Sequence, residues 1–488
     1  MRIARRAVCP AFIAAILLVL SSPVRCDEKS DATAAAVDGV FADFAKPGSP
    51  GCSLAVARDG ELLYSKGYGM ANLELEVPLS PSSVFDIGST SKQFSAASIL
   101  LLENQGKLSV NDDIHKYIPE LPDYGSKITI LNLLNHTSGL RDYLVLFELA
   151  GENVDSVTTD QEALALIARQ KALNFDPGSE WLYSNTGFFL LSVIVKRTSG
   201  KSLRDFAAEN IFQPLDMTHT QYRDNHTSLI SNRALAYDAV EKGGGYTLDV
   251  SYFEQTGDGA VHTTVGDLLK WDENFYSGKV GGKEFLAEIQ QTGTLTSGKQ
   301  LEYAKGLFID KYRGLRTVRH GGAWGGYRAE LLRFPDQHFS VVCLCNRSDG
   351  GPSRRADQVA EVYLGGIMKE KEPKTEDEED RKPRPEISVP AAELAGYAGD
   401  YISDELGVIY RLAAVNGKLT IANIFAGSIP RSNDLAGKQI VPVAKDEFEL
   451  VGEPIIFRFT RASAGHPASF ALDAGRTTGI RFVRLPAM

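Results

Sequence analysis

The segment FDIGSTSKQFSAASILLLENQG, residues 85–106, combines a strong helix pattern with a cluster of polar side chains. The pattern predicts a helix over residues 89–105 that ends before Gly106. Apolar residues lie on most sides of this helix, so we expect it to be buried. The helix opens with the tetrad STSK, which has the form S-x-x-K and is the first of three motifs that carry chemistry.

The S-x-x-K motif offers a nucleophile and a base. A helix that starts at Ser89 places Ser89 and Lys92 one turn apart on the same face. A serine hydroxyl is a poor nucleophile until a base removes its proton, and a lysine shielded from water can have a pKa low enough to do so. Free N–H groups at the helix N-terminus would also stabilise a developing oxyanion. On its own the motif is weak evidence, because Ser and Thr are common N-caps.

The second motif is Y-x-N, in the segment WLYSNTGFFLL. Tyr183 beside a lysine can pass a proton as a general acid or base. The amide of Asn185 can hold a substrate carbonyl and bridge to the lysine. On its own, the motif is typical of an ordinary turn that follows an aromatic-rich strand or the end of a helix.

The third motif is H-x-G, which follows the strand-like run LRTV. Small residues such as Gly322 let a substrate backbone lie against a strand edge. His320 could contact a substrate carboxylate or the nucleophile network. The backbone N–H of Ala323 could complete an oxyanion hole with that of Ser89. On its own this motif is a glycine-rich turn with an incidental histidine.

Together and in this order, the three motifs make the chain resemble one branch of the serine β-lactamase and penicillin-binding protein superfamily. That branch holds class C β-lactamases, D,D-carboxypeptidases, D-aminopeptidases and related esterases. Flanking phrases agree with it, including ITILNLLNHTSGLRDY at 128–143 and GDGAVHTTVGDLLKW at 257–271. The resemblance covers about residues 35–365.

The resemblance implies a mechanism and a fold. Ser89 would be the acylated nucleophile, Lys92 and Tyr183 would share the proton transfers, and Asn185 would orient the acyl side chain. The fold would be α/β, with an antiparallel sheet flanked by helices and an all-helical subdomain. His136, His262 and Trp271 are expected to be structural.

His320 departs from the class C β-lactamases, which carry a lysine at this place. An unperturbed histidine has a pKa near 6.5 and is largely neutral at pH 7. Gly321 also replaces a Thr or Ser hydroxyl that would contact the substrate. We therefore expect poor β-lactam hydrolysis, and faster reaction of carboxylate-bearing substrates as His320 gains charge toward pH 6.

Local patterns predict strands, then helices, then strands. Residues 50–66 form a hairpin pattern around Asp59-Gly60, and residues 130–290 are mostly helical. Strand patterns return in three runs, followed by a closing helix pattern; these cover residues 315–319, 327–334, 339–345 and 354–368. This order predicts one α/β domain whose sheet is completed by distant parts of the chain.

The length of 488 residues predicts more than one domain. The expected divisions are a signal peptide at 1–26, the hydrolase domain at 27–368, a charged linker at 369–390 and a β-domain at 391–488. The linker alternates both charge signs and lacks apolar residues over most of its length. The last segment has short β-like runs with frequent turns, which predicts an antiparallel barrel or sandwich. It resembles the lipocalin-like barrels appended to some of these hydrolases.

The N-terminus has the pattern of a secretory signal. Arginines at positions 2, 5 and 6 precede the apolar run AFIAAILLVL, which is too short for a comfortable transmembrane helix. Cleavage before Asp27 would give a secreted or periplasmic protein without stable membrane insertion. Of the five cysteines, Cys52, Cys343 and Cys345 follow this segment. A disulfide from Cys52 to either of the others is possible, whereas a metal site is not expected.

Composition limits the partners. The net charge of −10 predicts no nucleic-acid binding. The expected partner is a small-molecule or peptide substrate, no cofactor is implied, and the sequence makes no prediction about oligomeric state. The predicted function is a secreted serine hydrolase acting on a D-amino-acid peptide or a carboxylic ester. The alternatives are a class C-like β-lactamase and a penicillin-recognising sensor that is acylated without turnover.

Overall fold

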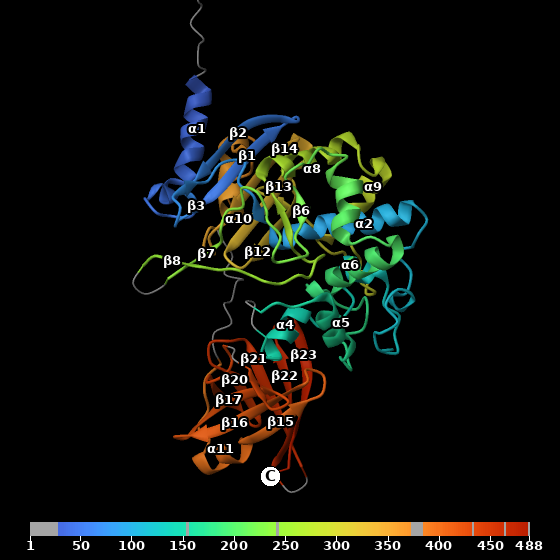
Figure 1. Cartoon of the computed structure of the whole chain (residues 1–488), viewed down its shortest axis with the longest axis vertical. Helices are drawn as coiled ribbons and strands as arrows, with labels where there is room; N and C mark the ends of the chain where they lie inside the picture. The colour runs from blue at the N-terminus through green and yellow to red at the C-terminus, as the bar shows by residue number, and fades with distance from the viewer. Residues whose placement is uncertain are drawn as a thin grey trace, which may run out of the picture.

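The computed structural model describes residues 28–152, 156–240, 244–371, 384–431, 434–462 and 465–486. The predicted signal peptide lies outside these residues. Figure 1 shows an α/β body in the upper part of the view and a β-barrel below it, with the helices α4 and α5 between the two. None of the described helices is both long and apolar enough to span a bilayer.

A seven-stranded antiparallel sheet forms the centre of the α/β body, in the order β10-β11-β12-β13-β14-β1-β2. The strands are β1 (Cys52–Arg58), β2 (Glu61–Tyr68), β10 (Tyr303–Ala304), β11 (Leu307–Tyr312), β12 (Leu315–Trp324), β13 (Tyr327–Phe334) and β14 (Phe339–Cys345). The N-terminal hairpin β1–β2 pairs with β14, which lies almost 300 residues later. The prediction of a sheet completed by distant parts of the chain is therefore confirmed.

Helices cover both faces of this sheet, as Figure 1 shows. Alternate residues of β14 face opposite sides of the sheet. Because helices cover both sides, every residue of the strand is buried. Val341 packs in the cluster that includes α1 (Glu28–Val40) and α10 (Pro352–Leu364). Val342 packs in the cluster of the opposite face, which includes α2 and α8.

The helices of that opposite side make up the predicted helical subdomain. They are α2 (Lys92–Asn104), α3 (Ile130–Leu134), α4 (Tyr143–Leu149), α5 (Asp160–Ala168), α6 (Asn185–Ser199), α7 (Leu203–Ala207), α8 (Val265–Ser277) and α9 (Gly282–Ile289). Short 3-10 or π turns occur at η1 (Ala42–Ala45), η2 (Gly88–Ser91), η3 (Ile114–Lys116), η4 (Ala208–Phe212) and η5 (Pro335–Gln337). Small ladders are formed by β3 (Met70–Asn72), β4 (Val77–Pro78), β5 (Phe85–Asp86), β6 (Gln221–Tyr222), β7 (Tyr237–Ala239), β8 (Tyr246–Leu248) and β9 (Val261–Thr263).

The helix predicted over 89–105 is present, but its first turn has 3-10 geometry. The motif serine lies in η2, and α2 begins at Lys92. The helix ends before Gly106, whose φ of 68° is a left-handed conformation suited to glycine. Most of α2 is buried, as its all-round apolar pattern predicts.

The C-terminal part is a barrel rather than a sandwich. It contains α11 (Ala391–Tyr397), β15 (Gly399–Ser403), β16 (Val408–Val415), β17 (Lys418–Ala426), β18 (Ile429–Arg431), β19 (Gln439–Ala444), β20 (Glu447–Leu450), β21 (Ile455–Arg461), β22 (Pro467–Ala474) and β23 (Thr477–Arg484). Pairing of β16 with β17 closes a ring of eight strands, and β18 extends from β17.

The barrel packs directly on the helical subdomain. Tyr410 of the barrel donates a hydrogen bond to the carbonyl of Leu149 at the end of α4, with an oxygen–oxygen distance of 2.7 Å. A buried ion pair joins Arg141 to Glu405 at 2.6 Å. Burial of both charges makes this contact costly to break, because either group alone would be left unpaired. The barrel therefore has a defined position beside the helices that carry the candidate site.

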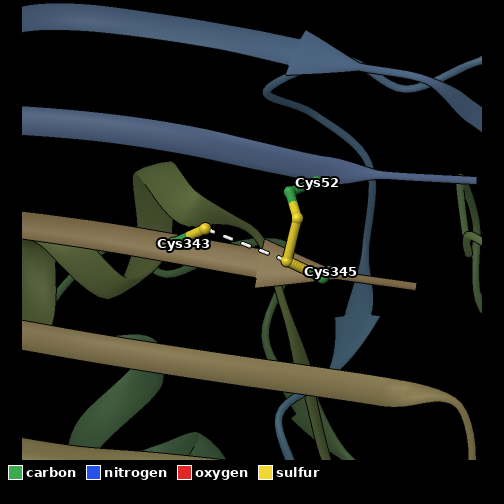
Figure 2. A group of neighbouring side chains, drawn as sticks. All are labelled: Cys52, Cys343 and Cys345. Atoms are coloured by element: carbon green, nitrogen blue, oxygen red, sulfur yellow. Dashed lines mark hydrogen bonds between the residues drawn. A yellow bond between two sulfur atoms is a disulfide. The ribbon is translucent and has the colours of Figure 1, made fainter. Parts of the chain in front are cut away.

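The disulfide joins Cys52 of β1 to Cys345 of β14 (Figure 2). Cys343 lies two residues earlier on β14 as a buried free thiol, with its sulfur 3.9 Å from that of Cys345. Burial raises the pKa of this thiol to about 12, so it is a poor nucleophile. Of the two pairings that the sequence allowed, the structure has the one with Cys345.

We expect this disulfide to stabilise the fold by about 2–5 kcal/mol, because it closes a very long loop in the unfolded chain. The variant Cys52→Ala/Cys345→Ala should have a lower Tm than the wild type. Dithiothreitol should lower the Tm of the wild type and leave that of the double variant unchanged. Cys343→Ala is the matched control and should keep its sensitivity to dithiothreitol; loss of that sensitivity would assign the bond to Cys343 instead.

Candidate active site

The three motifs meet at one cavity of about 630 Å³. It lies between the start of α2, the start of α6, the end of β12 and the barrel. Six of the seven predicted site residues line it: Ser89, Tyr183, Asn185, His320, Gly322 and Ala323. The seventh, Lys92, is fully buried directly behind Ser89. The structure thus brings together all the residues that the sequence selected.

The glycines of the motifs allow β12 to lie against the turn η2. A Cβ atom at Gly322 would come within 1.9 Å of the carbonyl oxygen of Ile87, so no larger residue fits there. A Cβ atom at Gly88 would lie 2.8 Å from the backbone nitrogen of Ala323. This contact places the backbone of Ala323 beside the nucleophile turn, where an oxyanion hole would need it.

Lys92 is held in contact with the nucleophile. Its Nζ donates hydrogen bonds to Ser89 Oγ at 3.0 Å, to Asn185 Oδ1 at 2.9 Å and to the carbonyl of Asp258 at 2.7 Å. Burial lowers the pKa of Lys92 to about 7, although the carboxylates of Asp258 and Asp142 partly oppose that effect. A substantial fraction of the lysine is then neutral near pH 7 and able to accept the proton of Ser89.

Tyr183 lies close to both Lys92 and the nucleophile. Its ring centroid is 4.8 Å from Lys92 Nζ, and its buried hydroxyl makes no hydrogen bond of standard length to any described residue. Burial raises the pKa of the phenol, and the nearby Ser89 hydroxyl only partly offsets this. The phenol therefore stays protonated at neutral pH, so it can pass a proton onward while Lys92 serves as the base.

His320 is neutral over the whole physiological range. Only 2% of it is exposed, and both ring nitrogens have partners, the carbonyl of Gly321 at 2.6 Å and the hydroxyl of Tyr303 at 3.3 Å. Burial, with the charge of Lys92, lowers the pKa of His320 to about 3. The expectation that His320 gains charge toward pH 6 is therefore wrong, because an exposed histidine was assumed. Its neutrality at pH 7 is confirmed.

Asp142 orients the asparagine of the Y-x-N motif and was not selected from the sequence. Its carboxylate caps the N-terminus of α4 through Oδ1 and accepts hydrogen bonds from Asn185 N and Nδ2 through Oδ2. These bonds turn the amide oxygen of Asn185 toward Lys92. Asp142 lies in the phrase ITILNLLNHTSGLRDY, where a helix N-cap was the only local signal.

The remaining aromatic and imidazole residues that the sequence marked as structural are packed around the site. His136 is buried against the ring of Tyr183, with centroids 4.2 Å apart, and its Nδ1 accepts the N–H of Ser184. Trp271 is buried in α8 and donates to Gln93 at 3.0 Å. His262 lines the cavity wall, and burial lowers its pKa to about 3.

Comparisons with known proteins agree with this geometry. The family model described as Beta-lactamase matches residues 37–364. Penicillin-binding protein 4* of Bacillus subtilis is 30% identical over 61% of this chain and 68% of its own length. A D-aminopeptidase of Brucella anthropi is 27% identical over 74% of this chain and 65% of its own length. The chain therefore spans about two thirds of the length of these relatives.

Solved structures show the same fold. The octameric penicillin-binding protein homologue from Pyrococcus abyssi has a TM-score of 0.61 at 23% identity, and the match covers 93% of this chain and 99% of that one. The D-amino acid amidase from Ochrobactrum anthropi SV3 has a TM-score of 0.58 at 23% identity, covering 69% of this chain and 99% of its own. The first match leaves only 7% of this chain uncovered, so it includes most of the segment that forms the C-terminal barrel.

Proposed function

Because this chain belongs to the beta-lactamase family and is a serine hydrolase, we propose that it hydrolyses D-amino-acid amides and peptides, or related carboxylic esters, through an acyl-enzyme on Ser89. The observation that carries the proposal is the contact of Ser89 Oγ with a buried lysine whose pKa is lowered to about 7. Relatives named D-aminopeptidase and D-amino acid amidase support the choice of substrate class.

In the proposed acylation step, neutral Lys92 takes the proton of Ser89 and the serine oxygen attacks the substrate carbonyl carbon. The resulting oxyanion is stabilised by the N–H groups of Ser89 and Ala323. As the bond to the leaving group breaks, the proton passes from Lys92 through Tyr183 to the leaving nitrogen or oxygen. Deacylation reverses these transfers, with a water molecule in place of the leaving group.

Efficient β-lactamase activity is the less favoured alternative. Anionic β-lactams need a positive partner for their carboxylate, and the neutral His320 offers at most a neutral hydrogen bond. Gly321 adds no hydroxyl. Penicillins are therefore expected to acylate Ser89 slowly.

The test is intact-mass analysis after incubation with a fluorophosphonate, benzylpenicillin, and matched D- and L-amino-acid amides and esters. We expect rapid fluorophosphonate labelling of Ser89, turnover of D-substrates and slow penicillin acylation. Rapid penicillin turnover would instead establish a β-lactamase. A stable penicillin adduct without turnover of any amide or ester would indicate the sensor function.

We also propose that the protein is exported. The support is the pattern of residues 1–26, with its arginines and short apolar run, together with the disulfide between Cys52 and Cys345. Structural disulfides, unlike catalytic ones, persist mainly in oxidising compartments.

A further inference from the structure

The barrel contributes one side chain to the cavity wall. Arg476 occupies the turn between β22 and β23, together with Gly475, and its guanidinium lines the cavity. Its side chain is 35% exposed. Arg476 is far from the three motifs in sequence and enters the site only because the barrel is seated against α4.

The turn that carries Arg476 is held to the helical subdomain by several polar contacts. The carbonyl of Arg476 accepts a hydrogen bond from Asn174 Nδ2 at 2.9 Å. Asn174 Oδ1 in turn accepts from the backbone N–H of Thr478 at 2.9 Å. The hydroxyl of Thr477 donates to the carbonyl of Asp142 at 3.5 Å. These contacts fix the backbone of the turn and so place the side chain of Arg476 at the cavity.

The guanidinium lies beside the Y-x-N motif. Its Nε is 3.4 Å from Asp142 Oδ2, and its Cζ is 5.7 Å from the ring centroid of Tyr183. The same oxygen of Asp142 already accepts two hydrogen bonds from Asn185, at 2.7 and 3.0 Å. The contact with Arg476 is longer than these bonds and involves its Nε. The remaining N–H groups of the guanidinium are therefore available to a ligand in the cavity.

Four other charged side chains line the cavity: Asp86, Arg223, Asp258 and Arg328. Arg223 and Arg328 donate to backbone carbonyls of neighbouring residues. Asp86 and Asp258 are buried, and burial raises the pKa of each carboxyl to about 6, so both stay largely ionised at pH 7. Neutral His320 adds no charge. Arg476 is therefore the cavity arginine whose guanidinium makes no hydrogen bond to the backbone of a described residue, although nearby carboxylates, Asp142 among them, offset part of its charge.

We propose that Arg476 binds a carboxylate on the acyl part of the substrate and so makes the barrel a determinant of specificity. Arginine is suited to this role, because its planar fork matches a carboxylate with two parallel hydrogen bonds. The acyl part is implicated because Arg476 adjoins Asn185, the residue that the family resemblance places against the acyl group. The preferred substrate is then an acidic D-amino-acid amide or peptide, and this inference rests on the proposed function.

Two substrates of the same shape test the proposal: the α-p-nitroanilides of N-acetyl-D-glutamate and N-acetyl-D-glutamine. We expect the wild type to favour the glutamate substrate by about tenfold or more in kcat/KM. Arg476→Gln should bring the ratio close to one, and Arg476→Lys should retain part of the preference. Arg476 also contributes to lowering the pKa of Lys92. A change in the pKa of Lys92 alters kcat/KM for both substrates equally, so the ratio of the two kcat/KM values at one pH does not depend on it.

Arg481→Gln is the matched control, since Arg481 lies exposed on β23, the strand that follows the turn of Arg476, and its removal changes the net charge equally. This variant should keep the wild-type ratio. A wild-type ratio near one, or a preference that survives Arg476→Gln, would overturn the proposal. A preference that disappears in Arg328→Gln and persists in Arg476→Gln would show that Arg328, not Arg476, binds the substrate carboxylate.

A binding measurement separates this proposal from the proposed function. The α-amides of N-acetyl-D-glutamate and N-acetyl-D-glutamine are used to protect Ser89 from labelling by a neutral fluorophosphonate. Stronger protection by the acidic amide, lost in Arg476→Gln, supports the carboxylate site even if neither anilide is cleaved. Equal protection by both amides rejects the site, and cleavage of both anilides at equal rates rejects it while leaving the proposed function in place.

Discussion

Replacing Ser89 with alanine is expected to lower kcat/KM for every substrate by about 10,000-fold or more while leaving the fold intact. Removal of an activated nucleophile leaves only binding and the oxyanion hole to assist the reaction. The hydroxyl faces the cavity and hydrogen-bonds to Lys92, so the change removes little packing. The measurements are steady-state rates with the best substrate found, intact mass after fluorophosphonate treatment, and the Tm.

Ser91→Ala is the matched control for this variant. Ser91 belongs to the same turn and is buried, but its hydroxyl accepts the N–H of Val261 at 3.1 Å instead of facing the cavity. We expect this variant to be less stable by about 1 kcal/mol and to remain labelled at Ser89. Activity above a few per cent in purified Ser89→Ala, or labelling lost in Ser91→Ala with the fold retained, would place the nucleophile elsewhere.

Replacing Lys92 with methionine is expected to slow acylation by about 1,000-fold or more, because general-base assistance to the serine is lost. Methionine fills a similar volume without a proton acceptor. The substitution leaves Asn185 Oδ1 and the carbonyl of Asp258 without their donor, so circular dichroism must first show a folded variant. The rate of fluorophosphonate labelling of Ser89 is the direct measurement.

The pH profile of the wild type tests the same role without a substitution. The base acts in its deprotonated form, so kcat/KM should fall about tenfold per pH unit below the pKa of Lys92 and level off above it. With that pKa lowered to about 7, the rise should end near neutrality. A rate that continues to rise toward pH 10 would show that the lysine is not shifted. The pH profile of kcat/KM should show no additional inflection from His320, because its pKa is lowered to about 3.

Much of the site could be predicted from the sequence because its signals are local. The S-x-x-K, Y-x-N and H-x-G motifs each occupy a few consecutive residues, and the apolar run after Ser89 predicted a buried helix. Turn chemistry at Asp59-Gly60 predicted the hairpin of β1 and β2. Such patterns depend on neighbours along the chain, which a sequence displays directly.

Tertiary structure alone determined the properties that depend on distant neighbours. The pKa of His320 follows from its burial against β11 and the charge of Lys92, neither of which is visible in the motif. The choice of Cys345 over Cys343 follows from the register in which β14 pairs with β1. Arg476 looks like any turn residue in the sequence and enters the site only through the docking of the barrel. The order of residues along the chain thus defined the nucleophile Ser89 and its helix. Packing between remote segments set the protonation state of His320 and brought the charge of Arg476 to the cavity.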